Sequence, residues 1–204
     1  MRSVQLTSRD ALLVVDVQND FLPEGSLAVA GGDEVVPVLN RYIALFTGLH
    51  LPVYATRDWH PANHCSFKPY GGIWPPHCIA GSRGAEFPAA LQLPRDTVII
   101  SKATSVEKEA YSGFEGTDLA ERLRAAGVER VFIGGLTTDY CVLTSITDAI
   151  RKGFEAVFLV DAIRAVNVHP GDGAAAVAEM RRQGAHSIVI ADIAQAQSTH
   201  PDAR

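Results

Sequence analysis

Six apolar segments along the chain predict β-strands. Each is short, rich in β-branched residues, and almost continuously apolar rather than alternating between apolar and polar positions. A run of this kind is typical of a strand that is covered on both faces, as in a parallel sheet. The segments are residues 11–17, 52–57, 97–102, 130–135, 156–161 and 186–192.

Helical patterns lie between most of these strands, because apolar residues recur there at helical spacing. In the second of them, Thr117 or Asp118 is placed to cap the first turn and Gly127 to end the helix. Strands that alternate with helices indicate an α/β fold, a three-layer, doubly wound, Rossmann-like sheet of about six mostly parallel strands with helices on both faces. The four predicted helices are residues 33–50, 116–127, 139–152 and 171–183.

The connection between the second and third strands, residues 58–96, breaks this alternation. It shows little regular periodicity, yet it contains both tryptophans, two of the three cysteines and three of the seven histidines. A loop of this length without helices or strands is uncommon in a compact domain and is often functional. Because the loop lacks a helix of its own, we expect a metal ion to organise it.

The expected ligands are Asp58, His60 and His77, with His64 as a fourth ligand or a group that supports one. A lone histidine is more often a packed or surface residue, but three histidines clustered with an aspartate favour a metal site. Imidazoles and a carboxylate suit one divalent ion, zinc first, with iron or manganese as alternatives.

A closed structural zinc site is the competing interpretation of this loop. It would use His60, His64, Cys65 and Cys78, and it would leave no position for a substrate. The chain has no CxxC pair, so the spacing gives this site little support. We therefore expect Cys65 and Cys78 to be small packing residues.

Three further residues stand where predicted strands end. Asp16 lies near the end of the first strand, Lys102 ends the third, and Cys141 falls in the first helical turn after the fourth. Taken singly, each has a purely structural explanation. The carboxyl ends of parallel strands share one edge of the sheet, however, so these groups are expected to meet each other there, beside the metal ligands. A helix N-terminus lowers the pKa of a thiol, and a thiol with a carboxylate and an ammonium suits acyl transfer.

Composition narrows the setting. We expect one domain over residues 1–204, with residues 193–204 as a poorly ordered polar tail. A net charge of −5 gives no support for a nucleic-acid or membrane partner, and no apolar run reaches transmembrane length. The N-terminus lacks the features of a signal peptide, and the odd number of cysteines argues against a disulfide framework, so we expect a cytoplasmic protein.

The order of these motifs resembles that of the nicotinamidases and pyrazinamidases of the isochorismatase-like cysteine hydrolase family. The pairing of DWHPANH with WPPHC is the most specific part, because it separates the metal-binding nicotinamidases from members of the family without the metal. The similar stretches are LLVVDVQNDFLPEGSLAV (12–29), YATRDWHPANHCSF (54–67), GGIWPPHCIAGSRGAEF (71–87), SKATSVEKEAYSGFEG (101–116), IGGLTTDYCVLTSITDAI (133–150) and VDAIRAVNVHPGDG (160–173).

The resemblance implies hydrolysis of nicotinamide to nicotinate and ammonia through a cysteine thioester, with pyrazinamide as a second substrate and the metal orienting the pyridine ring. A homo-oligomer is compatible with it. It also implies that the Leu136–Thr137 peptide bond is cis. The implied residues are the triad Asp16, Lys102 and Cys141, the metal ligands Asp58, His60 and His77 with His64 variable, the pocket residues Phe21, Trp74 and Tyr111, and an oxyanion hole from the N–H groups of Thr137 and Cys141.

Two positions depart from the family pattern, which more often has Ala at Thr137 and Gly at Ala103. Thr137 keeps its N–H group, and its extra bulk is expected to narrow the pocket. Two other functions stay open. One is a metal-independent isochorismatase or N-carbamoylsarcosine amidase with the same triad. The other is a non-catalytic module that binds a metal or ligand, which the presence of all three triad residues argues against.

Overall fold

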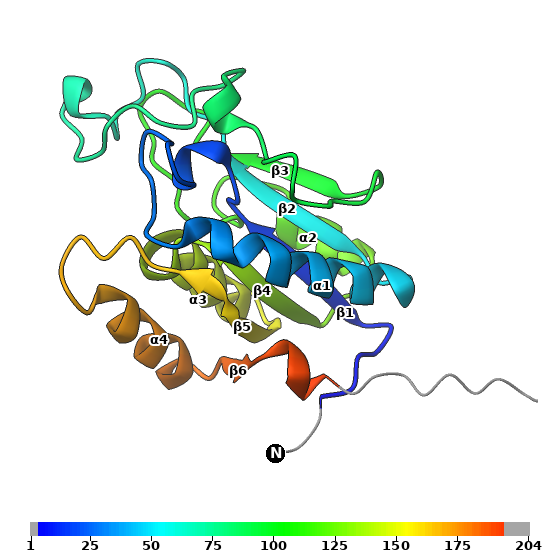
Figure 1. Cartoon of the computed structure of the whole chain (residues 1–204). Coiled ribbons are helices and arrows are strands. Elements are labelled where there is room, and N and C mark those ends of the chain that lie inside the picture. Colours follow the sequence, from blue (N-terminus) through cyan, green and yellow to red (C-terminus); the bar gives the residue numbers. More distant parts are fainter. Residues whose placement is uncertain (1–3, 194–204) are drawn as a thin grey trace, which may run out of the picture.

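The computed structural model describes residues 4–193, and these form one six-stranded sheet in the order β3-β2-β1-β4-β5-β6 (Figure 1). Every neighbouring pair of strands runs parallel, which confirms the predicted α/β architecture. The order reverses between β1 and β4, so a ligand site is expected at the carboxyl ends of these two strands. The strands are β1 (Asp10–Val15), β2 (Val53–Asp58), β3 (Val98–Lys102), β4 (Arg130–Leu136), β5 (Glu155–Arg164) and β6 (His186–Ile188).

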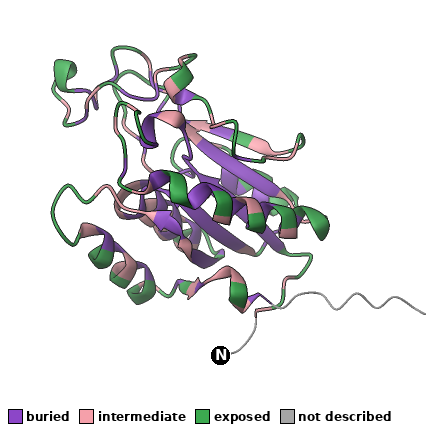
Figure 2. Cartoon of the chain, viewed as in Figure 1, coloured by how far each residue is buried: buried purple, intermediate pink, exposed green. Residues whose placement is uncertain are grey.

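Helices cover both faces of the sheet. Alternate residues of β1 serve the two layers: Leu12 and Val14 pack in the apolar cluster of α1, and Leu13 and Val15 pack in the cluster on the other side. Figure 2 shows the consequence, since the central strands β1, β2 and β4 are buried almost throughout while each helix keeps an exposed outer face. The helices are α1 (Val35–Gly48), α2 (Leu119–Ala125), α3 (Leu143–Arg151) and α4 (Asp172–Arg182). No helix within residues 4–193 is long and apolar enough to cross a membrane.

The last strand is shorter than its apolar pattern predicts. It ends at Ile188 rather than at residue 192, and Ile190–Asp192 form a 3-10 turn. The Asp192 carboxylate accepts a hydrogen bond from the Val189 N–H at 2.9 Å, so a local cap replaces further strand pairing. The predicted tail lies outside the described residues, except for Ile193.

Other boundaries shift by a few residues. β5 continues to Arg164, beyond the predicted end at residue 161, because its pairing with β4 resumes after an irregularity. α2 begins at Leu119 and is shorter than expected, but the Thr117 hydroxyl accepts a hydrogen bond from the Leu119 N–H at 3.3 Å, and Gly127 has a φ of 71° just beyond the helix. These last two features agree with the predicted cap and stop.

The long loop of residues 58–96 is irregular, as predicted, but it has an apolar centre of its own. It contains two short 3-10 turns, Lys68–Tyr70 and Arg83–Ala85. Phe67 is fully buried, and its ring lies 5.3–5.7 Å from the three histidine rings of the loop, measured between centroids. Side-chain packing therefore contributes to the order of the loop, in addition to any ion.

Three non-glycine residues at this edge of the sheet have left-handed backbones: Asp16 (φ 49°), Cys78 (φ 46°) and Ala103 (φ 51°). Asp16 and Ala103 directly follow the ends of β1 and β3, and Cys78 directly follows the predicted ligand His77. The chain turns sharply at each of the three positions. For a residue with a Cβ atom this conformation costs about 1–2 kcal/mol relative to the right-handed one. Ala103 carries no functional side chain, so it is the position where this cost can be removed by substitution.

We expect Ala103→Gly to raise the free energy of unfolding by about 0.5–1 kcal/mol, because glycine adopts a φ of 51° without steric cost. Urea unfolding followed by circular dichroism measures this. Ala125→Gly is the matched control. Ala125 is exposed in α2, and there the same change should lower stability by about 1 kcal/mol. Destabilisation by both substitutions would contradict the assignment of strain to Ala103.

Candidate active site

Strand ends bring the three predicted triad residues together. Asp16 follows β1, Lys102 ends β3, and Cys141 lies in the π-helical turn Thr138–Val142 between β4 and α3. Their exposed fractions are only 0%, 1% and 5%. The Lys102 Nζ atom lies 2.9 Å from Asp16 Oδ2 and 3.6 Å from Cys141 Sγ. The ammonium group therefore touches both the carboxylate and the thiol.

The two oxygens of the Asp16 carboxylate have different surroundings. Oδ1 accepts a hydrogen bond from the Thr56 hydroxyl at 2.6 Å, which fixes the orientation of the group. Oδ2 forms the ion pair with Lys102, but without hydrogen-bond geometry, and it accepts no hydrogen bond from any described residue. A carboxylate oxygen of Asp16 and the Cys141 sulfur lie within 4.8 Å of each other. Asp16 thus has an oxygen available for the proton of the thiol.

Burial decides the protonation state of the nucleophile. It raises the pKa of the Cys141 thiol well above its usual range, and the Lys102 ammonium only partly opposes this. The net shift is therefore opposite to the lowered pKa expected at a helix N-terminus, because burial outweighs that influence. Burial also raises the pKa of Asp16, against the opposing Lys102, which makes the carboxylate a stronger base.

Lys102 stays charged in this buried position. Desolvation alone would lower its pKa, but the carboxylates of Asp16 and Asp58 together raise it well above the ordinary value. Desolvation likewise opposes ionisation of Asp58, whose pKa is nevertheless lowered by Lys102 at 2.5 Å and by the neighbouring His60. The resting site thus holds one ammonium, two carboxylates and a neutral thiol.

The predicted metal ligands Asp58, His60 and His77 form a second buried group at this edge. One ligand atom from each lies within 4.8 Å of the others. His60 Nδ1 donates to the His77 carbonyl at 3.1 Å, and His77 Nδ1 donates to the Pro75 carbonyl at 2.8 Å. Because a carbonyl only accepts, both Nδ1 atoms carry a proton, and the neutral form of each imidazole has its lone pair on Nε2, where it can bind a metal.

His64 is placed differently from the other two histidines. Its Nε2 donates to the Lys108 carbonyl at 3.2 Å, and its Nδ1 lies 2.7 Å from the Ser66 hydroxyl. Both ring nitrogens are therefore occupied by the protein, and His64 does not join the Asp58/His60/His77 group. The expectation that His64 serves as a fourth ligand is not supported by this geometry. It belongs instead to a second cluster with His60 and Glu109.

The alternative closed zinc site is not formed by the part of the chain that the structure describes. Cys65 and Cys78 join none of the clusters of potential ligands in that part. Cys78 is fully buried in the apolar cluster around α1, and Cys65 is half-buried. Both are free thiols, as expected of packing residues.

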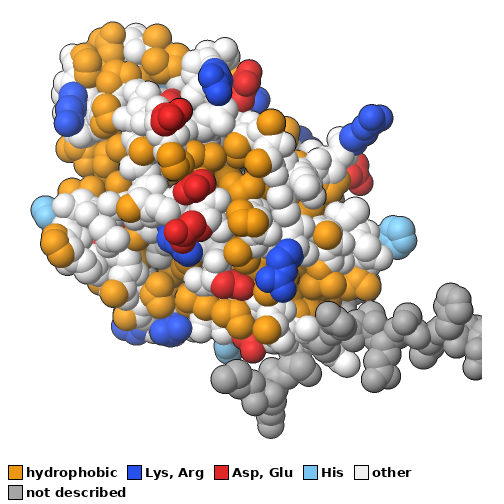
Figure 3. Space-filling view, viewed as in Figure 1, with side chains coloured by type: hydrophobic (Ala, Val, Ile, Leu, Met, Phe, Trp, Pro, Cys, Tyr) orange, Lys and Arg blue, Asp and Glu red, His pale blue; other side chains and the backbone are white. Residues whose placement is uncertain are grey.

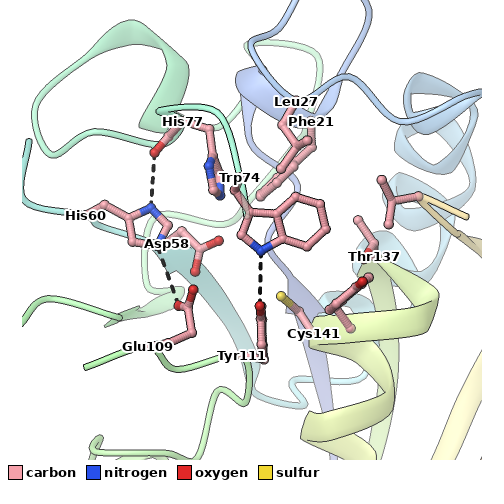
Figure 4. A pocket seen from close by; sticks show the side chains of 12 residues that line it. Phe21, Leu27, Asp58, His60, Trp74, His77, Glu109, Tyr111, Thr137 and Cys141 are labelled. Atoms are coloured by element: carbon pink, nitrogen blue, oxygen red, sulfur yellow. Dashed lines mark hydrogen bonds and ion pairs between the residues drawn. The ribbon is translucent and has the colours of Figure 1, made fainter. Parts of the chain in front are cut away.

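A pocket lies between the thiol and the Asp58/His60/His77 group (Figure 4). Trp74 forms one wall, and its indole N–H donates to the Tyr111 hydroxyl at 3.0 Å. Phe21 faces His77 with ring centroids 5.6 Å apart. Thr137 and Cys141 border the pocket on the side of α3, and the Leu136–Thr137 peptide bond is cis, as expected.

Four residues that line the pocket were missed by the sequence interpretation: Leu27, Glu109, Tyr140 and Val166. Tyr140 could have been predicted, since it directly precedes Cys141. Glu109 is one of several acidic residues on the loop after β3, and the sequence does not single it out. Glu109 lies 3.9 Å from His60 Nε2. Leu27 and Val166 carry no chemical signal in the sequence and come from distant segments, so only the fold reveals them.

Comparisons with known proteins agree with this site. The family model described as the isochorismatase domain matches residues 10–192. The nicotinamidase/pyrazinamidase of Mycobacterium tuberculosis is 40% identical over 179 residues, which cover 84% of this chain and 94% of that protein. The pyrazinamidase of Pyrococcus horikoshii, solved in complex with zinc, is 49% identical with a TM-score of 0.85, over 89% of this chain and 99% of that one. PnC1 from L. infantum, solved in complex with nicotinate, is 36% identical with a TM-score of 0.88, over 94% and 98%.

Proposed function

The chain belongs to the isochorismatase family, and from this premise we propose that it is a nicotinamidase, which hydrolyses nicotinamide to nicotinate and ammonia and accepts pyrazinamide as a second substrate. The observation that carries the proposal is one pocket lined by the Cys141 thiol and by the Asp58/His60/His77 group, with Lys102 and Asp16 buried behind the thiol. The relatives named nicotinamidase and pyrazinamidase, and the one bound to nicotinate, support the same substrate class.

The nucleophile in this proposal is the Cys141 sulfur. As Sγ attacks the carboxamide carbon, its proton passes to Asp16, which has a carboxylate oxygen within 4.8 Å of Sγ and a raised pKa. Lys102 stabilises the thiolate that develops 3.6 Å from its ammonium and holds Asp16 in place. The N–H groups of Thr137 and Cys141 bind the oxyanion, and such donors lower a barrier by about 3–4 kcal/mol.

The second half of the reaction uses the same groups in reverse. Asp16 gives the proton to the departing nitrogen, the C–N bond breaks, and ammonia leaves a thioester on Cys141. Asp16 then accepts a proton from a water molecule as its oxygen attacks the thioester carbon. The C–S bond breaks and the proton on Asp16 returns to the thiol. The product leaves as nicotinic acid, which ionises to nicotinate and gives its proton to the released ammonia or to solvent, so atoms and charges balance over the cycle.

We infer that Asp58, His60 and His77 hold one divalent ion, zinc first among the candidates. The donor set fits it, because the two imidazoles present free Nε2 lone pairs and the carboxylate is ionised. When bound, the ion would supply a Lewis acid for the pyridine nitrogen and thereby orient the ring. Phe21 and Trp74 would hold the faces and edges of that ring, and the buried pocket would limit access of water.

Two other functions compete with this proposal. A metal-independent isochorismatase or N-carbamoylsarcosine amidase would have no need of Asp58, His60 and His77 as ligands, yet this chain buries all three with one ligand atom of each within 4.8 Å of the others. A non-catalytic module that binds a metal or ligand would have no need of Asp16, Lys102 and Cys141, yet this chain buries the three side by side. On the face shown in Figure 3 the basic side chains are separated by apolar and acidic ones, so this face has no continuous basic patch.

The direct test is a substrate panel with the purified protein loaded with zinc. We expect release of ammonia and nicotinate in equal amounts from nicotinamide, and release of ammonia from pyrazinamide. N-Carbamoylsarcosine and isochorismate serve as matched substrates of the competing activities. Turnover of either one without turnover of nicotinamide would contradict the proposal.

A further inference from the structure

Gln18 is fully buried just beyond β1 and uses its whole amide group to bind backbone. Its Oε1 atom accepts a hydrogen bond from the Asp58 N–H at 2.8 Å. Its Nε2 group donates to the Asp58 carbonyl at 2.8 Å and to the Ala85 carbonyl at 2.9 Å. One side chain therefore holds both backbone groups of a predicted metal ligand.

Gln18 can bind the backbone of Asp58 because the pairing of β1 with β2 ends just before Asp58. The last backbone bond between the two strands is donated by the Asp16 N–H to the Thr56 carbonyl at 3.2 Å, after which the left-handed Asp16 turns the chain away. The backbone of Asp58 would face a gap at this point. The Gln18 amide fills it with the same pair of bonds that a strand would make. On its other side Asp58 pairs with Lys102 of β3, so it is fixed from both directions.

Asp20, two residues after Gln18, holds the backbone next to His77, the predicted ligand that lies on the loop. Its Oδ2 accepts from the Cys78 N–H at 2.7 Å, directly after His77, and its Oδ1 accepts from the Ser26 N–H at 3.1 Å. Gly84 packs so closely that a Cβ atom there would lie 2.1 Å from Asp20 Oδ2. The carboxylate therefore has little freedom to move.

We propose that Gln18 and Asp20 are positioning residues that set the affinity of the Asp58/His60/His77 group for its ion, an inference that rests on the metal site proposed above. Asp58 ends β2 and His77 lies on the long loop that follows, and both are held by hydrogen bonds from the single segment that leaves β1. These hydrogen bonds orient the ligands before the ion binds, so less conformational entropy is lost when it does. Groups that orient metal ligands typically contribute about 10–100-fold in metal affinity.

The test measures the dissociation constant of zinc for the full chain by competition with a chromogenic chelator. Gln18→Glu keeps the size and the acceptor but removes the donors to Asp58 and Ala85. We expect it, and Asp20→Asn, to weaken zinc binding about 10–100-fold. If Gln18→Glu does not fold, Gln18→Met of similar volume replaces it. Saturating zinc should restore most of the turnover of each variant.

Asn40→Asp is the matched control. The Asn40 amide holds the same loop in the same way, donating to the Ala90 carbonyl at 2.8 Å and accepting from the Gln92 N–H at 2.8 Å, but away from the ligands. Its zinc affinity should stay within about twofold of the wild type, since it braces no metal ligand. The melting temperature of the metal-free form is measured for every variant, since a purely structural role lowers it without changing the affinity for zinc.

His60→Ala separates this inference from the proposed function. If the wild type and His60→Ala bind zinc alike, the proposed metal site itself is wrong. If His60→Ala loses zinc while Gln18→Glu (or its Met replacement) or Asp20→Asn binds it as tightly as the wild type does, the metal site stands and the positioning role is overturned. The positioning role is also overturned if Asn40→Asp weakens zinc binding as much as these variants do.

Discussion

Cys141→Ala should lose nicotinamide hydrolysis by a factor of about 10⁴ or more, because no other group near the carboxamide carbon replaces the sulfur. Zinc content and the far-ultraviolet circular dichroism spectrum should stay as in the wild type, since Cys141 is not one of the three proposed ligands and its sulfur accepts a hydrogen bond from Lys102. Ammonia release measures the activity. Cys65→Ala is the matched control, because Cys65 is a half-buried thiol outside the triad and should retain full activity.

Asp16→Asn tests the proton transfer in the same assay. The amide cannot take the thiol proton, and burial raises the pKa of Cys141, so this variant should also be nearly inactive. Alkylation of Cys141 by iodoacetamide should not slow, because the reactive species is the thiolate and the Asp16 carboxylate raises the pKa of the thiol. Normal ammonia release by Cys141→Ala or by Asp16→Asn would refute the assigned roles.

Removal of the metal should separate two substrates that differ only in the ring nitrogen. Chelation of the wild type, or the substitution His60→Ala, should abolish most hydrolysis of nicotinamide while the fold and the alkylation of Cys141 persist. Benzamide lacks the nitrogen that the ion would hold, so its slow hydrolysis should change little. Rates for both substrates before and after chelation, with circular dichroism as the control for folding, provide the measurement.

His64→Ala is the matched variant for this experiment. Both His64 ring nitrogens are occupied by Ser66 and Lys108, so this protein should keep its zinc and its nicotinamidase activity. Equal loss of activity on nicotinamide and benzamide after chelation would favour a structural ion instead. A metal-free protein that hydrolyses nicotinamide at the original rate would show that the ion does not orient the ring.

The sequence predicts the sheet and its edge well, because continuous apolar runs and parallel topology follow from local pattern and general rules of connection. Asp16, Lys102 and Cys141 meet as expected since each stands at the end of a strand. The end of β6 was mispredicted because the apolar run continues through a turn that Asp192 caps. A run of apolar residues does not by itself distinguish the last residues of a strand from a capped turn.

Properties that depend on distant segments were harder to predict. The pKa of Cys141 is governed by burial, which comes from the whole fold and outweighs the expected influence of the helix terminus. His64 resembles its neighbours in sequence, but a hydrogen bond to the carbonyl of Lys108, on a separate loop, removes its lone pair from the metal group. Leu27 and Val166 reach the pocket only through the packing of their loops.

Phe67 beside the three histidine rings has a consequence for how the protein acquires its ion. The buried Phe67 ring packs against the histidine rings, so the ligands are already in place in the metal-free protein. The ion can therefore bind or dissociate without refolding of the loop. The rate at which the bound ion exchanges then depends on how fast the ligands release it. The metal carried in a living cell would follow the supply of free divalent ions and their intrinsic order of affinity. Growth in media that differ in zinc, iron and manganese should therefore change the metal content of otherwise identical protein.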